Sequence, residues 1–362
     1  MVQAKPEHIA LHWQEAGEPK QAVLHWLRAG KQANRNCAHR EAITHLHAAL
    51  NILPSEPETQ ETLLQSFDAH MGLGTAHYAI EGYASPDGVA AYKQAIVLGD
   101  RLKETNPEKI GPELFRAHWG HWASVSSQLD YGQSLSLTKF LVREAVKRND
   151  PVERQQAHFA AGNIHYWRGE FAQAQKDLEI STALYDPSHD EDLIGGYGEH
   201  AFVTGSAYLS WVFGVRGHIE AARDAGRRSL ETGEAIGHPF SQGYGLTFAT
   251  VLARLFREPK ETLRLAQETI ALGHRHNFPL WVVGATLNEG WAMVHLGDAN
   301  GLGRMRESVE AVKNLMSGIT LIFLRSPSFV IATSHDRHLG VGKVPQQHGD
   351  RQFVPSAIAL HR

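Results

Sequence analysis

Cysteine, excess charge of either sign and long apolar runs are all scarce in this chain of 362 residues. Its single cysteine, Cys37, excludes an internal disulfide framework and fits a reducing compartment. A net charge of -4 gives no general attraction to phosphate backbones or anionic membranes, so we expect neither nucleic acid nor a membrane as partner. The longest candidate span, Ile319 to Leu324, is far shorter than the ~20 apolar residues that cross a bilayer. The N-terminus lacks the apolar core of a secretory signal, and we expect a cytoplasmic protein.

Motifs for catalysis and metal binding are missing as well. No string matches the phosphate-binding pattern G-x-x-x-x-G-K-[ST], since residues 340–343 (GVGK) lack both the leading glycine and the following hydroxyl. Histidine is abundant, with 23 residues, but the pair His8 and His12 has no third ligand nearby and no glutamate after its first member. We therefore expect no catalytic residue, no cofactor and no metal site.

A helical-hairpin pattern recurs along most of the chain. In its clearest copy, the small residues Gly162, Gly169 and Ala174 stand where two helices touch. Related copies start at forty-residue steps, at Ser210, Thr250 and Gly290. A single αα unit cannot bury its apolar face, so such units stack into a solenoid whose curved surface serves recognition. The sequence predicts an all-α, αα-hairpin solenoid of tetratricopeptide-like repeats, with about six or seven units.

Proline and composition mark the expected boundaries. Asp150-Pro151, His238-Pro239 and Phe278-Pro279 each separate two successive units. We expect an N-terminal helical repeat over 1–56, the solenoid over 57–316 and an irregular or disordered tail over 317–362, where helical periodicity ends.

Three stretches inside these boundaries are harder to interpret. At the N-terminus, Trp26, Gly30 and Ala42 fit one unit, but Trp26 also fits the second half of an earlier unit. Residues 83–88 are expected to form a turn before a helix that begins at Val89. Between Leu114 and Lys147 the small residues are out of place, and we expect one degenerate unit there.

The spacing of Trp26, Gly30, Ala42 and Pro54 resembles the tetratricopeptide superfamily. Longer phrases, over roughly residues 6–316, resemble the C-terminal arm of bacterial class III adenylate/guanylate cyclase–AAA/STAND ATPase signalling proteins. These phrases are LHWQEAGEPKQAVLHWLRAGKQA, GYASPDGVAAYKQA, GNIHYWRGEFAQAQKDLEISTALYDP, AIGHPFSQGYGLTFA and NFPLWVVGATLNEGWAMVHLGD. The resemblance implies an arm that senses a ligand or partner and restrains the ATPase. The cyclase and ATPase domains of that family are absent from this chain.

The tail departs from the resemblance. Where the family arm would continue with helical repeats, the sequence changes character within a few residues of Met316. A shifted reading frame or truncated gene would produce this change, and so would a genuine lineage-specific tail. We favour disruption, which makes a truncated, non-functional fragment one alternative.

The predicted binding surface is the concave side of the solenoid. In such hairpins the exposed positions follow the central small residue of the first helix by one, four and five residues. This spacing selects the candidate groove residues Lys31, Asn34, Arg35, Asn163, Tyr166, Trp167, Trp211, Arg254 and Trp291. Aromatic rings, amides and guanidinium groups suit an extended peptide or a carboxylate. For Trp211 and Trp291 the other interpretation is core packing between repeats.

We therefore expect a non-catalytic protein-interaction or regulatory module, with a protein or peptide partner. The second alternative is a solenoid that senses a small molecule on its concave surface. An independent hydrolase is the third.

Overall fold

The computed structural model describes residues 5–128 and 130–315, and within them the ordered elements are all helical. In chain order they are α1 (Pro6–Glu15), α2 (Pro19–Arg35), α3 (His39–Ile52), the 3₁₀ helix η1 (Leu53–Ser55), α4 (Gln60–Glu81), α5 (Pro86–Lys103), α6 (Pro107–Ser127), α7 (Tyr131–Arg148), α8 (Pro151–Trp167), α9 (Phe171–Ala183), η2 (Pro187–His189), α10 (Asp190–Tyr197), α11 (Ala201–Val215), α12 (Ile219–Ile236), α13 (Pro239–Leu255), α14 (Pro259–His276), α15 (Pro279–His295) and α16 (Gly301–Leu315). The predicted tail, 317–362, lies outside the described residues.

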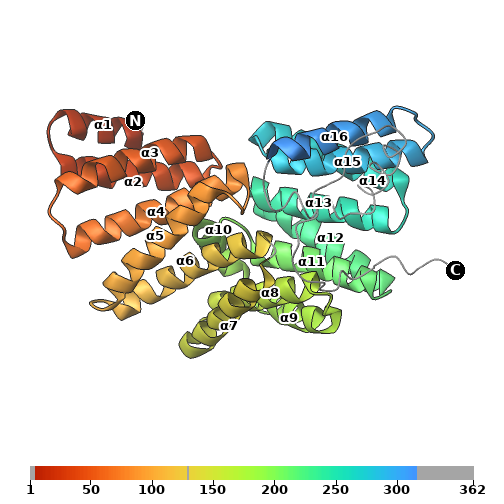
Figure 1. Cartoon of the computed structure of the whole chain (residues 1–362), viewed down its shortest axis with the longest axis horizontal. Helices are drawn as coiled ribbons and strands as arrows, with labels where there is room; N and C mark the ends of the chain where they lie inside the picture. The colour runs from red at the N-terminus through yellow and green to blue at the C-terminus, as the bar shows by residue number, and fades with distance from the viewer. Residues whose placement is uncertain (1–4, 129, 316–362) are drawn as a thin grey trace, which may run out of the picture.

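Antiparallel helix pairs build the chain. The pairs in the described residues are α2/α3, α4/α5, α6/α7, α8/α9, α11/α12, α13/α14 and α15/α16, while α1 packs on α2. Each first helix also contacts the first helix of the next pair, and Figure 1 shows the pairs following one another around an arch. This arrangement confirms the all-α, αα-hairpin solenoid.

Small residues let the two helices of a pair approach closely. A Cβ atom at Gly162 on α8 would lie 2.5 Å from Cγ of Leu178 on α9, and a Cβ at Gly30 would lie 2.6 Å from Leu46. Both leucines are buried, so the missing side chain is filled by the partner helix. The predicted close contact at Gly162 is confirmed.

Prolines open the inner helices as expected. Pro151, Pro239 and Pro279 are the first residues of α8, α13 and α15, where a missing N–H costs nothing. The expected helix start at Val89 is wrong by three residues. Because the Ser85 side chain accepts a hydrogen bond from the Gly88 N–H, α5 is capped at Ser85 and begins at Pro86.

At the N-terminus, both alternatives for the repeat that contains Trp26 hold, because helices pack on both sides of it. Helix α2 pairs with both α1 and α3, so the residues around Trp26 serve both alternatives. The blurred stretch forms the single pair α6/α7, as expected. Its irregular pattern reflects Trp119 and Trp122, which are buried on α6.

Helix α10 was not predicted. Ser210 follows Gly162 by 48 residues, eight more than the forty-residue step, and α10 has eight residues. It lies on the inner side of the arch (Figure 1), where Tyr197 packs edge-on against Trp119 with 5.2 Å between ring centroids. The guanidinium of Arg116 on α6 lies 5.7 Å from the Tyr197 ring.

The α2–α3 and α4–α5 turns contact the beginning of α13 on the inner side of the arch. Tyr83, in the α4–α5 turn, packs edge-on against Phe240, with 6.4 Å between ring centroids. Cys37, in the α2–α3 turn, hydrogen bonds to the Phe240 backbone. Cys37 is therefore a half-buried turn residue in a left-handed conformation. Burial raises the pKa of its thiol to about 11, which disfavours the reactive thiolate.

Within the described ranges, none of the helices combines the length and apolar character needed to cross a membrane.

Candidate functional site

The inner helices surround a cavity of about 80 Å³ on the concave side. Its walls come from five of these helices and two turns. The principal lining residues are Trp119 and Trp122 of α6, Phe159, Asn163 and Trp167 of α8, Tyr208 and Trp211 of α11, Tyr244, Thr247 and Phe248 of α13, Trp281 of α15, and the turn residues Tyr83 and Glu199. Segments up to about 200 residues apart in sequence thus form one aromatic site.

One wall is a stack of rings from α11 and α13. Trp211 lies flat on Phe248, with ring centroids 3.9 Å apart and planes at 17°, and its Nε1 donates to the Phe248 carbonyl at 2.9 Å. Tyr244 stacks on the same Phe248 ring at 4.8 Å. Because each ring is held by its neighbour, this wall is pre-formed.

Tyr208 lies at the centre of the aromatic cluster. The indole Nε1 of Trp167 donates to its hydroxyl at 3.3 Å, and Tyr166 packs edge-on against it at 5.6 Å. Asn163 also hydrogen bonds to Tyr208. Burial raises the pKa of Tyr208 to about 12, so its hydroxyl stays protonated and can both donate and accept.

Glu199 supplies the carboxylate of the cavity. The preceding Gly198 ends α10 in the left-handed conformation (φ 72°), and a Cβ there would lie 2.9 Å from Thr75 on α4. This tight turn places Glu199 in the interior, where it is 2% exposed. The Tyr83 hydroxyl donates a hydrogen bond to its Oε2, whereas Oε1 has no partner among the described residues.

Burial raises the pKa of Glu199 to about 7, and the hydroxyls of Tyr83 and Thr204 offset this rise only in part. None of the described lysines, arginines or histidines lines the cavity, so Glu199 has no counter-ion there. An unpaired carboxylate in such surroundings is costly in its charged form.

Several other polar atoms of the cavity residues lack partners within the described part of the chain. They are Nε1 of Trp119, Trp122 and Trp281 and Oγ1 of Thr247. All four side chains are buried. Because buried polar groups in folded proteins almost always find a partner, we expect ordered water or a bound group beside these atoms.

The structure brings three of the predicted groove residues into this cavity. Asn163, Trp167 and Trp211 line it, and Tyr166 packs directly behind Trp167, with 5.1 Å between ring centroids. Trp211 is half-buried at the rim and also holds the wall described above. It therefore lines the cavity and also packs against the next repeat.

The other candidates lie elsewhere. Lys31 and Arg35 line a second hollow of about 600 Å³ along α2, together with Asn34. Arg254 is half-buried in the last turn of α13, and burial lowers its pKa to about 10. Trp291 is 7% exposed, in a cluster with Met305 of α16, and its ring is tilted against that of His295 with 4.1 Å between centroids. Its place is in the packing between two helices.

Sequence reasoning missed Tyr83, Glu199 and three tryptophans of the cavity. Trp119 and Trp122 lie between Leu114 and Lys147, where the repeat pattern is irregular. Trp281 is not at one of the positions, counted from a central small residue, that predicted the groove residues. The sequence GGYGE at 195–199, which interrupts the forty-residue step, was the available signal for Glu199.

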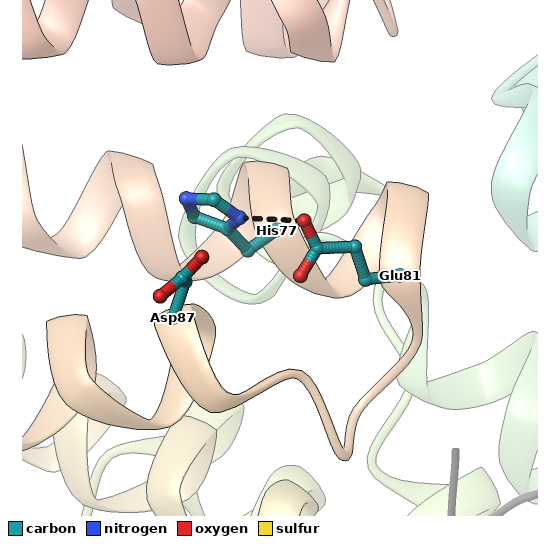
Figure 2. Close-up of side chains that lie close together, drawn as sticks. All are labelled: His77, Glu81 and Asp87. Carbon is teal, nitrogen blue, oxygen red and sulfur yellow. Dashed lines mark hydrogen bonds and ion pairs between the residues drawn. The ribbon is translucent and has the colours of Figure 1, made fainter. Parts of the chain in front are cut away.

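A second cluster of polar residues lies at the end of α4. His77, Glu81 and Asp87 place potential metal-ligand atoms within 4.8 Å of one another (Figure 2). His77 Nδ1 lies 3.2 Å from Glu81 Oε1, and Ser85 donates to Glu81 Oε2, so both carboxylate oxygens already have partners. These bonds hold the turn that carries Tyr83 to Glu199.

No family model and no curated protein matches the chain, but solved structures do. The Rap conjugation gene regulator of plasmid pLS20, solved in complex with the Phr* peptide, is 13% identical with a TM-score of 0.63, over 83% of this chain and 77% of that one. The fold is similar to that of Rap proteins. The apo form of RapI is 12% identical, with a TM-score of 0.56, over 80% of this chain and 97% of RapI.

A Rap protein complexed with Competence and Sporulation Factor gives the same identity of 12% and TM-score of 0.56, over 88% of this chain and 82% of that one. At these identities the likeness to Rap proteins is one of fold. It supports a tetratricopeptide-like helical solenoid and carries no information on a cyclase or ATPase association.

Proposed function

We propose that this chain is a non-catalytic regulatory module that binds a peptide or protein segment on its concave surface. The observation that carries this proposal is the cavity on the inner helices, where Asn163, Trp167 and Trp211 come together. Trp167 and Trp211 are half-buried at its rim, and each uses its indole N–H within the protein. Such rings offer rigid apolar area at little entropic cost to a bound chain.

Cations outside the cavity add a second kind of contact. Lys31 and Arg35 on α2 form no ion pair with the described residues, and neither does Arg254 on α13. A guanidinium without a carboxylate partner is suited to an acidic side chain or a terminal carboxylate of a ligand. We assign these three residues to ligand binding, and Tyr166 to support of the aromatic rim.

The similarity to Rap proteins supports a peptide as ligand. One of those proteins was solved with the Phr* peptide and another with Competence and Sporulation Factor. A long αα solenoid that encloses an extended ligand on its inner side is a recurrent use of this architecture. Trp291 is assigned here to packing between α15 and α16, since it lies away from the cavity.

The finer assignment, that the chain is the sensor arm of a bacterial, cytoplasmic cyclase–ATPase signalling protein, is also our proposal. It rests on the resemblance of the phrases between residues 6 and 316. The genomic sequence on either side provides the test, because an upstream reading frame with a P-loop and a cyclase domain would support it. Neighbouring genes of unrelated type would remove it.

Site-specific photo-crosslinking tests the binding surface. A photoreactive phenylalanine analogue replaces Trp211 at the rim of the cavity in one variant and exposed Lys176 on the outer helix α9 in another. If the concave surface binds a peptide, crosslinks to one discrete species should form at position 211 and be absent at 176. Equal labelling from both positions would contradict the proposal.

A small-molecule sensor is the second candidate function. The observation that favours it is the set of unpartnered polar atoms around a cavity of only about 80 Å³. That volume holds about six water molecules, at ~10–15 Å³ for each, and matches one small organic group better than several side chains of a peptide.

A further inference from the structure

We propose that the aromatic cavity binds an organic ammonium group, which pairs with Glu199 and is enclosed by tryptophan rings. The site does not depend on the proposed peptide function, because a free ammonium compound and an ammonium group carried on a peptide would both fit the same chemistry.

The described lining of the cavity carries an unbalanced negative charge when Glu199 is ionised. Glu199 is the one acidic residue among its described lining residues, and those residues include no cation. One carboxylate oxygen accepts from Tyr83, while the other is buried with no hydrogen-bond partner among the described residues. A cation that brings both charge and an N–H or N–CH₃ donor would compensate the carboxylate, which water alone does less well in so apolar an enclosure.

Tryptophan side chains form part of the cavity wall. Trp119 and Trp122 of α6 and Trp281 of α15 line it, and all three are at most 4% exposed. The electron-rich face of an indole attracts cations, most strongly when water is excluded, and cages of aromatic rings are the usual receptors for methylated ammonium groups. An anion would instead face Glu199 and the negative ring faces.

The cavity is small and can be reached from the concave side. The cavity volume of about 80 Å³ suits a group of a few heavy atoms, such as a trimethylammonium or a primary ammonium on a short alkyl chain. The rim residues Trp167 and Trp211 are half-buried, so the group can enter from the concave side. The walls are held by contacts within the protein, so little ordering is needed when the group enters.

The test compares charged and neutral probes of one shape. Choline and its neutral isostere 3,3-dimethylbutan-1-ol are titrated into the full chain by calorimetry, at constant ionic strength and slightly alkaline pH. We expect choline to bind at least about tenfold more tightly than the isostere, because one desolvated cation–π and carboxylate interaction exceeds 1.4 kcal/mol. Equal affinities, or no heat with either probe at millimolar concentration, would overturn the proposal.

Two variants locate the effect. Glu199→Gln preserves the shape of the side chain and should remove the preference for choline, whereas Glu179→Gln, on the exposed face of α9, should retain it. If Glu199→Gln fails to fold by circular dichroism, Trp122→Leu replaces it and should weaken choline by about tenfold while the isostere loses less. If Glu199→Gln, or Trp122→Leu in its place, still prefers choline to the neutral isostere as strongly as the wild type does, the assignment is contradicted.

The source of the group is decided by a second pair of probes. The capped tripeptide Ac-Gly-Lys-Gly-NH₂ and its trimethyl-lysine form are compared with free choline. Tighter binding of either tripeptide would place the ammonium on a peptide, and tighter binding of choline would indicate a free metabolite. Loss of ammonium binding with retained crosslinking at position 211 would overturn this site and leave the peptide function in place.

Discussion

The phenolic hydroxyl of Tyr83 donates a hydrogen bond to the carboxylate of Glu199, which lies 116 residues further along the chain. This bond joins the α4–α5 turn to the turn after α10, inside the arch. The Thr204 hydroxyl also acts on this carboxylate, but the bond from Tyr83 is the one that links it to a turn of the N-terminal half. Its removal should therefore affect both stability and the protonation of Glu199.

Tyr83→Phe should lower the free energy of unfolding by about 1.5–3 kcal/mol at pH 8.5, because an ionised buried carboxylate loses its donor. At pH 5.5, where Glu199 is protonated, the loss should be nearer 1 kcal/mol. Urea denaturation at the two pH values measures both. Tyr166→Phe is the control, since its hydroxyl makes no hydrogen bond within the described residues. An equal loss at both pH values would contradict the ionised-state role.

Glu199 should make stability depend on pH. Its folded pKa of about 7 lies above the ordinary value of 4.5, so the folded chain binds more protons between these values. The free energy of unfolding therefore falls as pH rises from about 4.5 through 7, by up to about 3 kcal/mol. Glu199→Gln should remove this contribution. The difference in the free energy of unfolding between wild type and variant should change between about pH 4.5 and 7 and stay constant above pH 7.

Histidines with a lowered pKa should reduce the stability of the fold at acid pH, which is the opposite of the effect of Glu199. Burial lowers the pKa of His39, His118 and His238 to about 4, so the unfolded chain binds more protons between pH 4 and 6.5. Stability is therefore lost as pH falls from 6.5 to 4, by up to about 3 kcal/mol for each group. His238→Gln should reduce this acid sensitivity. His8→Gln, on the exposed side of α1, should leave the profile unchanged.

Gly162 should not tolerate a larger residue. A Cβ there would lie 2.5 Å from Leu178 and 3.2 Å from its backbone nitrogen, so Gly162→Ala should cost about 1–3 kcal/mol and Gly162→Leu more. Gly303→Ala on α16 is the matched control, because a Cβ at that position meets nothing within 4 Å. It should be neutral or stabilise by about 0.5 kcal/mol. Similar melting temperatures for the two alanine variants would show that the contact at Gly162 is unimportant.

Asn163 and Arg254 should contribute to peptide binding. Replacing either by Ala should weaken binding of the crosslinked partner by about 1–3 kcal/mol, since a desolvated polar group of the ligand loses its partner. Lys176→Ala, on the outer helix α9, should do little. Titration of the partner into all three variants, with helical content checked by circular dichroism, gives the comparison. Equal affinity for the three would place the binding surface elsewhere.

The regular part of this fold could be predicted from sequence because it depends on local, repeated contacts. Small residues such as Gly162 and prolines such as Pro239 recur at fixed offsets, and each repeat packs mainly on its neighbours. The helix boundary at Pro86 was less predictable, because a single Ser85 hydroxyl decides it.

The cavity could be predicted only in part. Asn163, Trp167 and Trp211 obey the repeat spacing, but Glu199 and Tyr83 enter through turns that no period describes. Helix α10 places Glu199 inside the arch, and its position depends on packing between Tyr197 and Trp119, 78 residues apart. Contacts between non-neighbouring segments have no signature in a repeat pattern.

The contacts of Cys37 and Tyr83 with the beginning of α13 also bear on how the chain unfolds. In an open solenoid each repeat is held by its two neighbours, so unfolding can start at one end and propagate stepwise. Here the α2–α3 and α4–α5 turns contact a segment about 160–200 residues away. Loss of either end releases contacts of the other, which couples the two halves into one cooperative unit. We therefore expect the repeats to unfold together in one transition, although they are arranged as a linear array.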